Sequence, residues 1–348
     1  MKNTFLLTIV TYVLISCNVS SDISLRALFP EVQIPKSSVL PIGPDDIREP
    51  VLLASRDSIL VCTNQMTKQV LKVYNLDSGA YRDLIYIGRA ENELLNASAI
   101  WFSGDTLNVY SSNSGKILRI PSEELFEPQP AIRSIPFPSG YSGLTAFAGS
   151  SHYVAMNMLS DTPLQFLLLD GGGAELAGFG NYPEKGSQGH YREARLVYQG
   201  KLAASPDRTH IAYASSFGNI FRFFDISDSS DISLVCEYRF TEPEYISDSD
   251  PSEHRYSVIW ENTCHRGTLA MAAVDEGCYI LCDDTKTVSD DDWRMCSSVY
   301  CFDWEGNPLR KLDLGRRTQS IAYNRERRQL IALTVNERDE YVFVAYNL

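Results

Sequence analysis

Cysteine and histidine are the side chains best suited to metal binding and nucleophilic chemistry, and this 348-residue chain has eight cysteines and five histidines. The most concentrated set is Cys264-His265, with His254 nearby in the sequence. Zinc sites usually have closely spaced pairs of ligands on both sides, and a second pair is missing here. We therefore expect no metal site and no cofactor.

Nucleophilic and phosphate-binding sites usually carry a local motif, and the sequence has none of the common ones. It contains no Gly-x-Ser-x-Gly elbow, no Walker loop and no dinucleotide-binding glycine pattern. The histidines are scattered along the chain, at His152, His190, His210, His254 and His265. We accordingly assign no catalytic residues.

Seven cysteines follow Cys17, and in an exported protein disulfides are allowed. Cys278 and Cys282 lie on one expected strand, about 13 Å apart at about 3.3 Å per residue, so they cannot bond to each other. Two cross-strand disulfides stay open, Cys278 with Cys301 and Cys282 with Cys296, and each needs a one-residue bulge. Buried free thiols that behave as small apolar groups are the favoured interpretation.

Two segments, residues 241–254 and 283–293, are rich in carboxylates. Clustered carboxylates suit Ca²⁺, but neither segment has the Asp-x-Asp-x-Asp-Gly order that ends in Glu. Both segments are polar, contain many turn residues and lack regular apolar alternation. They are expected to be solvated surface loops.

The charge balance limits the class of partner. Lys and Arg total 31 and Asp and Glu total 44, which gives a formal net charge of −13. Such a chain repels phosphate backbones and lacks the basic surface that nucleic-acid binding requires. We exclude nucleic acid and expect a neutral, cationic or peptidic partner.

The N-terminus has the pattern of an export signal: Lys2 is followed by an apolar stretch at residues 5–15. That stretch is too short to span a bilayer as a helix. It ends in Leu14-Ile15-Ser16-Cys17, an order that resembles the bacterial lipobox. The resemblance implies a signal peptide over residues 1–16, acylation of Cys17 and attachment to the membrane through that lipid.

Alternating apolar runs that end in the same kind of short phrase occur six times. Taking their ends as Asn75, Ile120, Asp170, Asp225, Asp303 and Asn347 gives intervals of 45, 50, 55, 78 and 44 residues. Such intervals match one four-stranded propeller blade. We predict an all-β, six-bladed β-propeller with four-stranded antiparallel blades over residues 51–348. The two acidic segments account for the 78-residue interval, and a seventh blade is the alternative.

Residues 17–50 are predicted to form a tether and lead-in punctuated by prolines. A propeller must close its ring, because an open edge strand invites aggregation. The chain ends on an expected strand at residues 340–346, so the last blade needs a further strand. We expect residues 32–34 or 23–25 to supply it.

Several features together resemble the TolB-like six-bladed propeller lipoproteins of Bacteroides-type bacteria. They are the lipobox, six irregular blades, the Ala204-Ser205-Pro206-Asp207 turn before a strand, and the segment Ile87-Gly88-Arg89-Ala90-Glu91-Asn92-Glu93. The resemblance covers residues 51–348. It implies a cell-envelope lipoprotein anchored to the outer membrane, and it carries over no catalytic residue.

We expect the propeller to bind a protein, peptide or glycan through its loop face or central funnel, because blade cores hold loops rigidly while the loops vary. The alternative is a propeller lyase or hydrolase with a polar site at the channel mouth, which His190 or His210 would be placed to reach. A cluster of His, Arg and carboxylate in the funnel would favour the enzyme. An apolar or aromatic funnel would favour binding.

Overall fold

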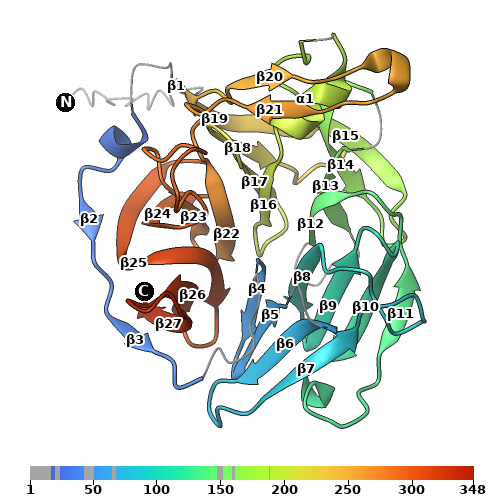
Figure 1. The fold of residues 1–348 in the computed structure, drawn as a ribbon, viewed down its shortest axis with the longest axis vertical. Coiled ribbons are helices and arrows are strands. Elements are labelled where there is room, and N and C mark those ends of the chain that lie inside the picture. The colour runs from blue at the N-terminus through green and yellow to red at the C-terminus, as the bar shows by residue number, and fades with distance from the viewer. Residues whose placement is uncertain are drawn as a thin grey trace, which may run out of the picture.

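The computed structural model describes residues 17–19, 24–42, 51–64, 68–146, 152–158, 161–187 and 189–348. The signal peptide expected over residues 1–16 lies outside them. The described residues form an all-β ring of six blades around a common axis, as predicted (Figure 1). Each blade is an antiparallel meander in which the chain moves outward strand by strand and then passes to the inside of the next blade.

Blades 1 to 3 each contain four consecutive strands. Blade 1 has β4 (Leu53–Arg56), β5 (Ile59–Thr63), β6 (Gln69–Asn75) and β7 (Tyr81–Tyr86). Blade 2 has β8 (Ala99–Ser103), β9 (Thr106–Ser111), β10 (Lys116–Pro121) and β11 (Arg133–Pro136). Blade 3 has β12 (Ser142–Ala146), β13 (Tyr153–Met156), β14 (Leu164–Leu169) and β15 (Glu175–Asn181). A 3₁₀ turn, η2 (Ser122–Glu124), follows β10.

Blade 4 also contains four consecutive strands, whereas blades 5 and 6 share one long strand. Blade 4 has β16 (Gly200–Ala204), β17 (His210–Ser215), β18 (Asn219–Asp225) and β19 (Ser233–Thr241). The remaining strands are β22 (Thr268–Val274), β23 (Gly277–Cys282), β24 (Cys296–Asp303), β25 (Pro308–Asn324), β26 (Gln329–Val335) and β27 (Tyr341–Asn347). The first half of β25 is the outer strand of blade 5, and its second half is the inner strand of blade 6.

The six repeated phrases of the sequence all mark the same position in a blade. They fall at the ends of β6, β10, β14, β18, β24 and β27, the third strand of each blade. This strand pairs on both sides and is buried on both faces, so its apolar residues are the most regular. The long interval between Asp225 and Asp303 therefore contains insertions within and between blades 4 and 5, and no seventh blade.

Apolar side chains fill the space between each pair of successive blades. Six buried clusters lie one at each interface, including the one between blade 6 and blade 1 that joins Leu333 and Phe343 to Leu60 and Tyr74. A polar tie crosses from blade 4 to blade 3, where buried Arg222 donates to Gln165 Oε1 at 2.7 Å and to the Asn181 carbonyl at 2.6 Å. Each blade is thus held by its two neighbours.

The lead-in is a belt along the outer rims of three blades. β1 (Cys17–Val19) pairs in parallel with β19 of blade 4, β2 (Val32–Gln33) pairs in parallel with β25 in blade 5, and β3 (Ser37–Val39) pairs with β27 in blade 6. The expected ring-closing segments, residues 32–34 and 23–25, are therefore wrong. Residues 37–39 close the ring, because the chain reaches blade 6 only after it has crossed blade 5.

Two buried side chains fix this belt. The 3₁₀ turn η1 (Leu25–Leu28) is capped by Ser24 and places Leu25 in the core between blades 4 and 5. Phe29 lies beside it, with its ring centroid 5.3 Å from that of Tyr300 and 5.2 Å from that of Phe302. Residues 24–42 are consequently part of the folded domain and not a free tether.

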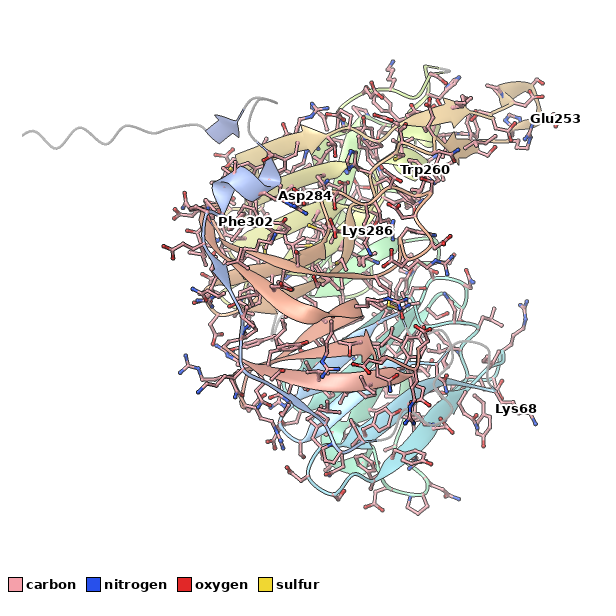
Figure 2. The ribbon with its side chains drawn as sticks, turned by 60° about the vertical axis from the view of Figure 1, so that its left-hand side comes forward. Lys68, Glu253, Trp260, Asp284, Lys286 and Phe302 are labelled. Carbon is pink, nitrogen blue, oxygen red and sulfur yellow. The ribbon has the colours of Figure 1, made fainter. Side chains whose placement is uncertain are left out.

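The first acidic segment is more ordered than the expected loop. It contains β20 (Tyr245–Ser247) and the 3₁₀ turn η3 (Pro251–Glu253), and β20 forms a hairpin with β21 (Val258–Trp260), which follows the segment. Figure 2 shows this hairpin projecting from the ring, with Glu253 at its far end and Trp260 nearer the blades. Its base packs on α1 (Tyr191–Val197), a helix that the sequence reading missed.

Neither of the two disulfides that the sequence left open forms. Cys278 lies opposite Phe302, and Cys301 lies opposite Tyr279. Cys278 and Cys282 face the core towards blade 4, whereas Cys301 and Cys296 face the core towards blade 6. Because the partners sit on opposite faces of one sheet, they cannot meet. All seven described cysteines outside β1 are buried free thiols, which was the favoured interpretation.

No helix among the described residues has the length and apolar character needed to cross a bilayer.

We predict that the packing of the belt contributes to the free energy of unfolding. We expect Phe29→Ala to lower the free energy of unfolding by about 3 to 5 kcal/mol, because it leaves a cavity between two aromatic rings. Ile34→Ala is the matched control in the same segment, since Ile34 is 81% exposed and its loss should cost less than about 0.5 kcal/mol. Urea denaturation followed by tryptophan fluorescence measures both, and equal effects would contradict the packing role of Phe29.

Candidate functional site: the upper mouth of the central channel

A central cavity of about 510 Å³ runs along the axis of the ring. Residues from all six innermost strands, β4, β8, β12, β16, β22 and the second half of β25, line it. All six strands run in the same direction, because each blade repeats the same meander. The face at which they begin is termed the upper face.

The lining changes in character from one end to the other. Near the upper face it has polar groups of Ser98, Gln199, Ser216 and Ser320. The middle is mainly apolar, and it includes Ile100, Leu202 and Met271. At the lower end Arg325 and Asp275 form an ion pair with an N–O distance of 2.7 Å.

Lys201 is the one cation in the upper part of the described channel lining. It is the second residue of β16, and its backbone pairs with Ala214. Its side chain is only partly exposed and forms no ion pair with a described carboxylate. Desolvation, together with the nearby Arg266 guanidinium, lowers the pKa of Lys201 to about 8.

Arg266 is held at the channel mouth by aromatic rings. Its Cζ atom lies 4.8 Å from the ring centroid of Phe217 and 4.9 Å from that of Trp293. Phe217 in turn stacks on Trp260, with centroids 3.7 Å apart and an interplanar angle of 16°. The Arg266 Nη1 atom donates to the Ser216 carbonyl at 2.6 Å, which joins this ladder to the channel lining. Burial, more than the neighbouring charges, lowers the pKa of Arg266 to about 10, so it stays charged at neutral pH.

Buried polar atoms without a hydrogen-bond partner gather near this mouth. Within the described part of the chain they include His265 Nδ1, Arg266 Nε, Thr268 Oγ1 and Gln319 Oε1. Thr268 is fully buried. Buried polar atoms normally have partners, so such a concentration points to a ligand or ordered water at this place.

Two carboxylates of the second acidic segment are engaged with other cations. Asp284 pairs with Arg26 at 2.8 Å, and Asp292 pairs with Lys286 at 2.7 Å. Arg294, whose Cζ lies 4.8 Å from the Trp293 ring centroid, has no carboxylate partner among the described residues. Three cations, Lys201, Arg266 and Arg294, therefore carry uncompensated charge on a molecule whose net charge is −13.

The histidines singled out in the sequence lie away from this site. His190 precedes α1, and its Nδ1 lies 3.1 Å from an Asp161 carboxylate oxygen. His210 begins β17, towards the lower face, with its Nδ1 2.7 Å from Thr209 Oγ1. Neither belongs to the described lining of the cavity.

The surroundings of Cys264, His265 and His254 show whether these residues could bind zinc together. Cys264 is buried and its sulfur accepts a hydrogen bond from the Glu244 amide at 3.4 Å. His254 lies in the left-handed conformation after η3, at the far end of the hairpin. No three metal-binding side chains come together within the described ranges, in the acidic segments or elsewhere.

Sequence reasoning missed the residues that form the mouth. Lys201, Phe217 and Arg266 belong to three separate segments and follow no motif. Only the pairing of β17, β18 and β22 with their neighbours, and the bridge between Phe217 and Arg266, brings them together. The tryptophans carried a weak signal, because Trp293 lies in an acidic segment and Trp260 follows the other one.

Six radial blades, ring closure by an N-terminal strand and an axial channel define a six-bladed β-propeller. The family described as TolB-like 6-blade propeller-like matches residues 29–325. The chain therefore belongs to the TolB-like six-bladed propeller family, as the resemblance indicated. No curated protein matches the sequence.

A similar solved structure with a TM-score above 0.5 supports the fold. A putative exported protein from Bacteroides fragilis is 9% identical, with 94% of this chain and 97% of that chain covered and a TM-score of 0.54. The β-propeller domain of Cps50 (Swd1) from Myceliophteria thermophila is 12% identical, with 90% of this chain and all of that chain covered and a TM-score of 0.49. At these identities the likeness extends to the fold alone.

The unpaired charge on Lys201 should lower the stability of the free protein. The unfolded chain, with a lysine pKa of about 10.4, binds this proton more tightly than the folded one, so stability rises with pH between about 8 and 10.4. We expect Lys201→Met to raise the free energy of unfolding by about 1 to 3 kcal/mol at pH 7, and the gain to shrink towards pH 10.

Urea denaturation at pH 7 and pH 10 measures this difference. Lys68→Met is the control, because Lys68 is exposed at the molecular edge (Figure 2) and should change stability by less than about 0.5 kcal/mol. A gain that stays the same at both pH values would mean that methionine packing, and not removal of a buried charge, is responsible.

Proposed function

We propose that this protein is a lipid-anchored lipoprotein of the outer membrane that binds its ligand at the upper mouth of the propeller channel. The lipid anchor rests on Leu14-Ile15-Ser16-Cys17 and the preceding apolar stretch. Membership of the TolB-like family and the fold shared with an exported protein support an envelope location. The leaflet side, periplasmic or surface, is left open.

The observation that carries the binding function is the channel itself. Its volume of about 510 Å³ falls within the range of small-molecule sites. The upper half combines an apolar wall with a few polar groups and one unpaired cation, which is the usual composition of a binding pocket. A ligand of this kind is a small molecule or the exposed end of a glycan, peptide or protein.

The lining supports binding over the lyase or hydrolase alternative. A catalytic funnel would bring His, Arg and carboxylate groups together around one pocket. The charged groups in the described lining are Lys201, Asp275 and Arg325, and the last two neutralise each other at the lower end. Lys201 is thus separated from the carboxylate that acid–base chemistry would require.

Lipid attachment is tested by Cys17→Ser expressed in a bacterium that processes lipoproteins. We expect the native protein to lack residues 1–16, to carry acyl chains on Cys17 and to sediment with membranes. The variant should remain unacylated and leave the membrane fraction, whereas Ser21→Ala should behave as the native protein. An intact mass without acyl chains on the native protein would end the lipoprotein proposal.

Channel binding is tested by filling the channel below its mouth. Thr145 lines the cavity on β12 and is partly exposed, so Thr145→Trp should block the channel with little effect on the blade cores. Native mass spectrometry against neutral sugars, acidic sugars and dipeptides should detect ligands for the native protein that this variant loses. Tyr81→Trp, on the exposed rim of blade 1, is the control and should bind like the native protein. Ligands that bind both variants equally would place recognition outside the channel.

A further inference from the structure

We propose that the ligand at the upper mouth is a uronate, an acidic sugar whose carboxylate is bound by Arg266 and Lys201 and whose hydroxyl groups contact the polar rim of the channel. This inference rests on the proposed binding function and adds the chemical class of the ligand.

Arg266 has one guanidinium nitrogen that is buried without a partner among the described residues. The Nη1 atom is committed to the Ser216 carbonyl, and Cζ lies 4.8 Å from the ring centroid of Phe217 and 4.9 Å from that of Trp293. Nε is buried and has no partner among the described residues. The Nε and Nη2 edge is the one that accepts a carboxylate side-on with two parallel hydrogen bonds. The aromatic ladder fixes the orientation of this edge before the ligand arrives.

Lys201 supplies a second positive charge inside the mouth. The positive charge of Lys201 attracts an anionic ligand. A neutral ligand would displace water from Lys201 and Arg266 without neutralising their charges, which costs free energy. Asp284 and Asp292, in the second acidic segment, already pair with other cations. The site therefore lacks a negative charge that a ligand would supply. One ligand carboxylate between Lys201 and Arg266 would supply it.

The rest of the rim suits a sugar ring. Ser98, Gln199 and Ser216 come from blades 2 and 4 and line the same end of the cavity as Lys201. Hydroxyl and amide groups both donate and accept, so they match the hydroxyls of a pyranose. The apolar wall deeper in the channel, with Ile100 and Leu202, accommodates the less polar face of the ring.

The test uses three probes that differ at one group: D-glucuronate, D-glucuronamide and D-glucose. In isothermal titration calorimetry at pH 7 and low salt, we expect the full-length protein to bind glucuronate at least tenfold more tightly than the other two. Lys201→Met and Arg266→Lys should each weaken glucuronate binding at least tenfold. Lys68→Met, on the exposed edge, should leave it unchanged.

Thermal denaturation of each variant separates loss of binding from loss of folding, and Lys201→Met is expected to be the more stable protein. Equal affinities for the acid and its amide, or unchanged affinity in a folded Lys201→Met, would overturn the uronate assignment. Tighter binding of inorganic phosphate or of an N-acetylated dipeptide would also overturn it. If a neutral ligand binds and Thr145→Trp blocks it, the channel function stands and only this inference falls.

A pH profile gives an independent readout. The affinity for glucuronate should fall as pH rises from 7 to 9.5, because the Lys201 amine loses the charge that attracts the carboxylate. Of the strands beside β16, β12 and β22 carry no titratable side chain, and β17 carries His210 and Tyr213. His210 starts its strand at the lower end, and Tyr213 donates to the Tyr198 carbonyl. Lys201→Met should therefore show a flat profile, and a profile that still falls would contradict the role of Lys201.

Discussion

Burial of apolar faces between successive blades is the constraint on which this molecule depends. No blade covers its own two faces, so each requires a neighbour on both sides, and only a closed ring provides that for all six. The belt formed by β1, β2 and β3 follows from the same requirement, because the outer edges of blades 4 to 6 are covered by the chain's own first residues. Closure also fixes the inner strands around the axis, and the binding channel is a consequence of that geometry.

The sequence was sufficient to predict the blades but not the connections between them. The third strands are buried on both faces and repeat the same apolar pattern, which is why their spacing predicted six blades. The closing strand at residues 37–39 was missed because Ser37 and Ser38 lie on an exposed edge, where apolar alternation is not required. The helix α1 was missed for a similar reason: its buried positions Ala194 and Val197 fit one short turn among polar residues.

The mouth of the channel was beyond prediction for a different physical reason. Lys201, Phe217, Arg266 and Trp293 lie in segments that belong to two blades and one insertion. Each is unremarkable in its own segment, and their relation exists only after the ring has closed. The sequence shows aromatic residues in and near the insertions. It does not show that Phe217 and Trp293 both contact the Arg266 guanidinium.

The net charge and the local charge of the mouth act over different distances, and together they narrow the choice of ligand. At physiological ionic strength screening reduces interactions beyond about 8 Å, so the −13 charge acts mainly on large partners near the surface, whereas Lys201 and Arg266 act at contact. A polyanion would be repelled by the acidic surface before it reached the channel. A small, hydroxylated ring with a single carboxylate is repelled much less by the acidic surface. Once inside the channel, its carboxylate interacts with both Lys201 and Arg266. The arrangement therefore favours one terminal acidic sugar over an extended anionic polymer.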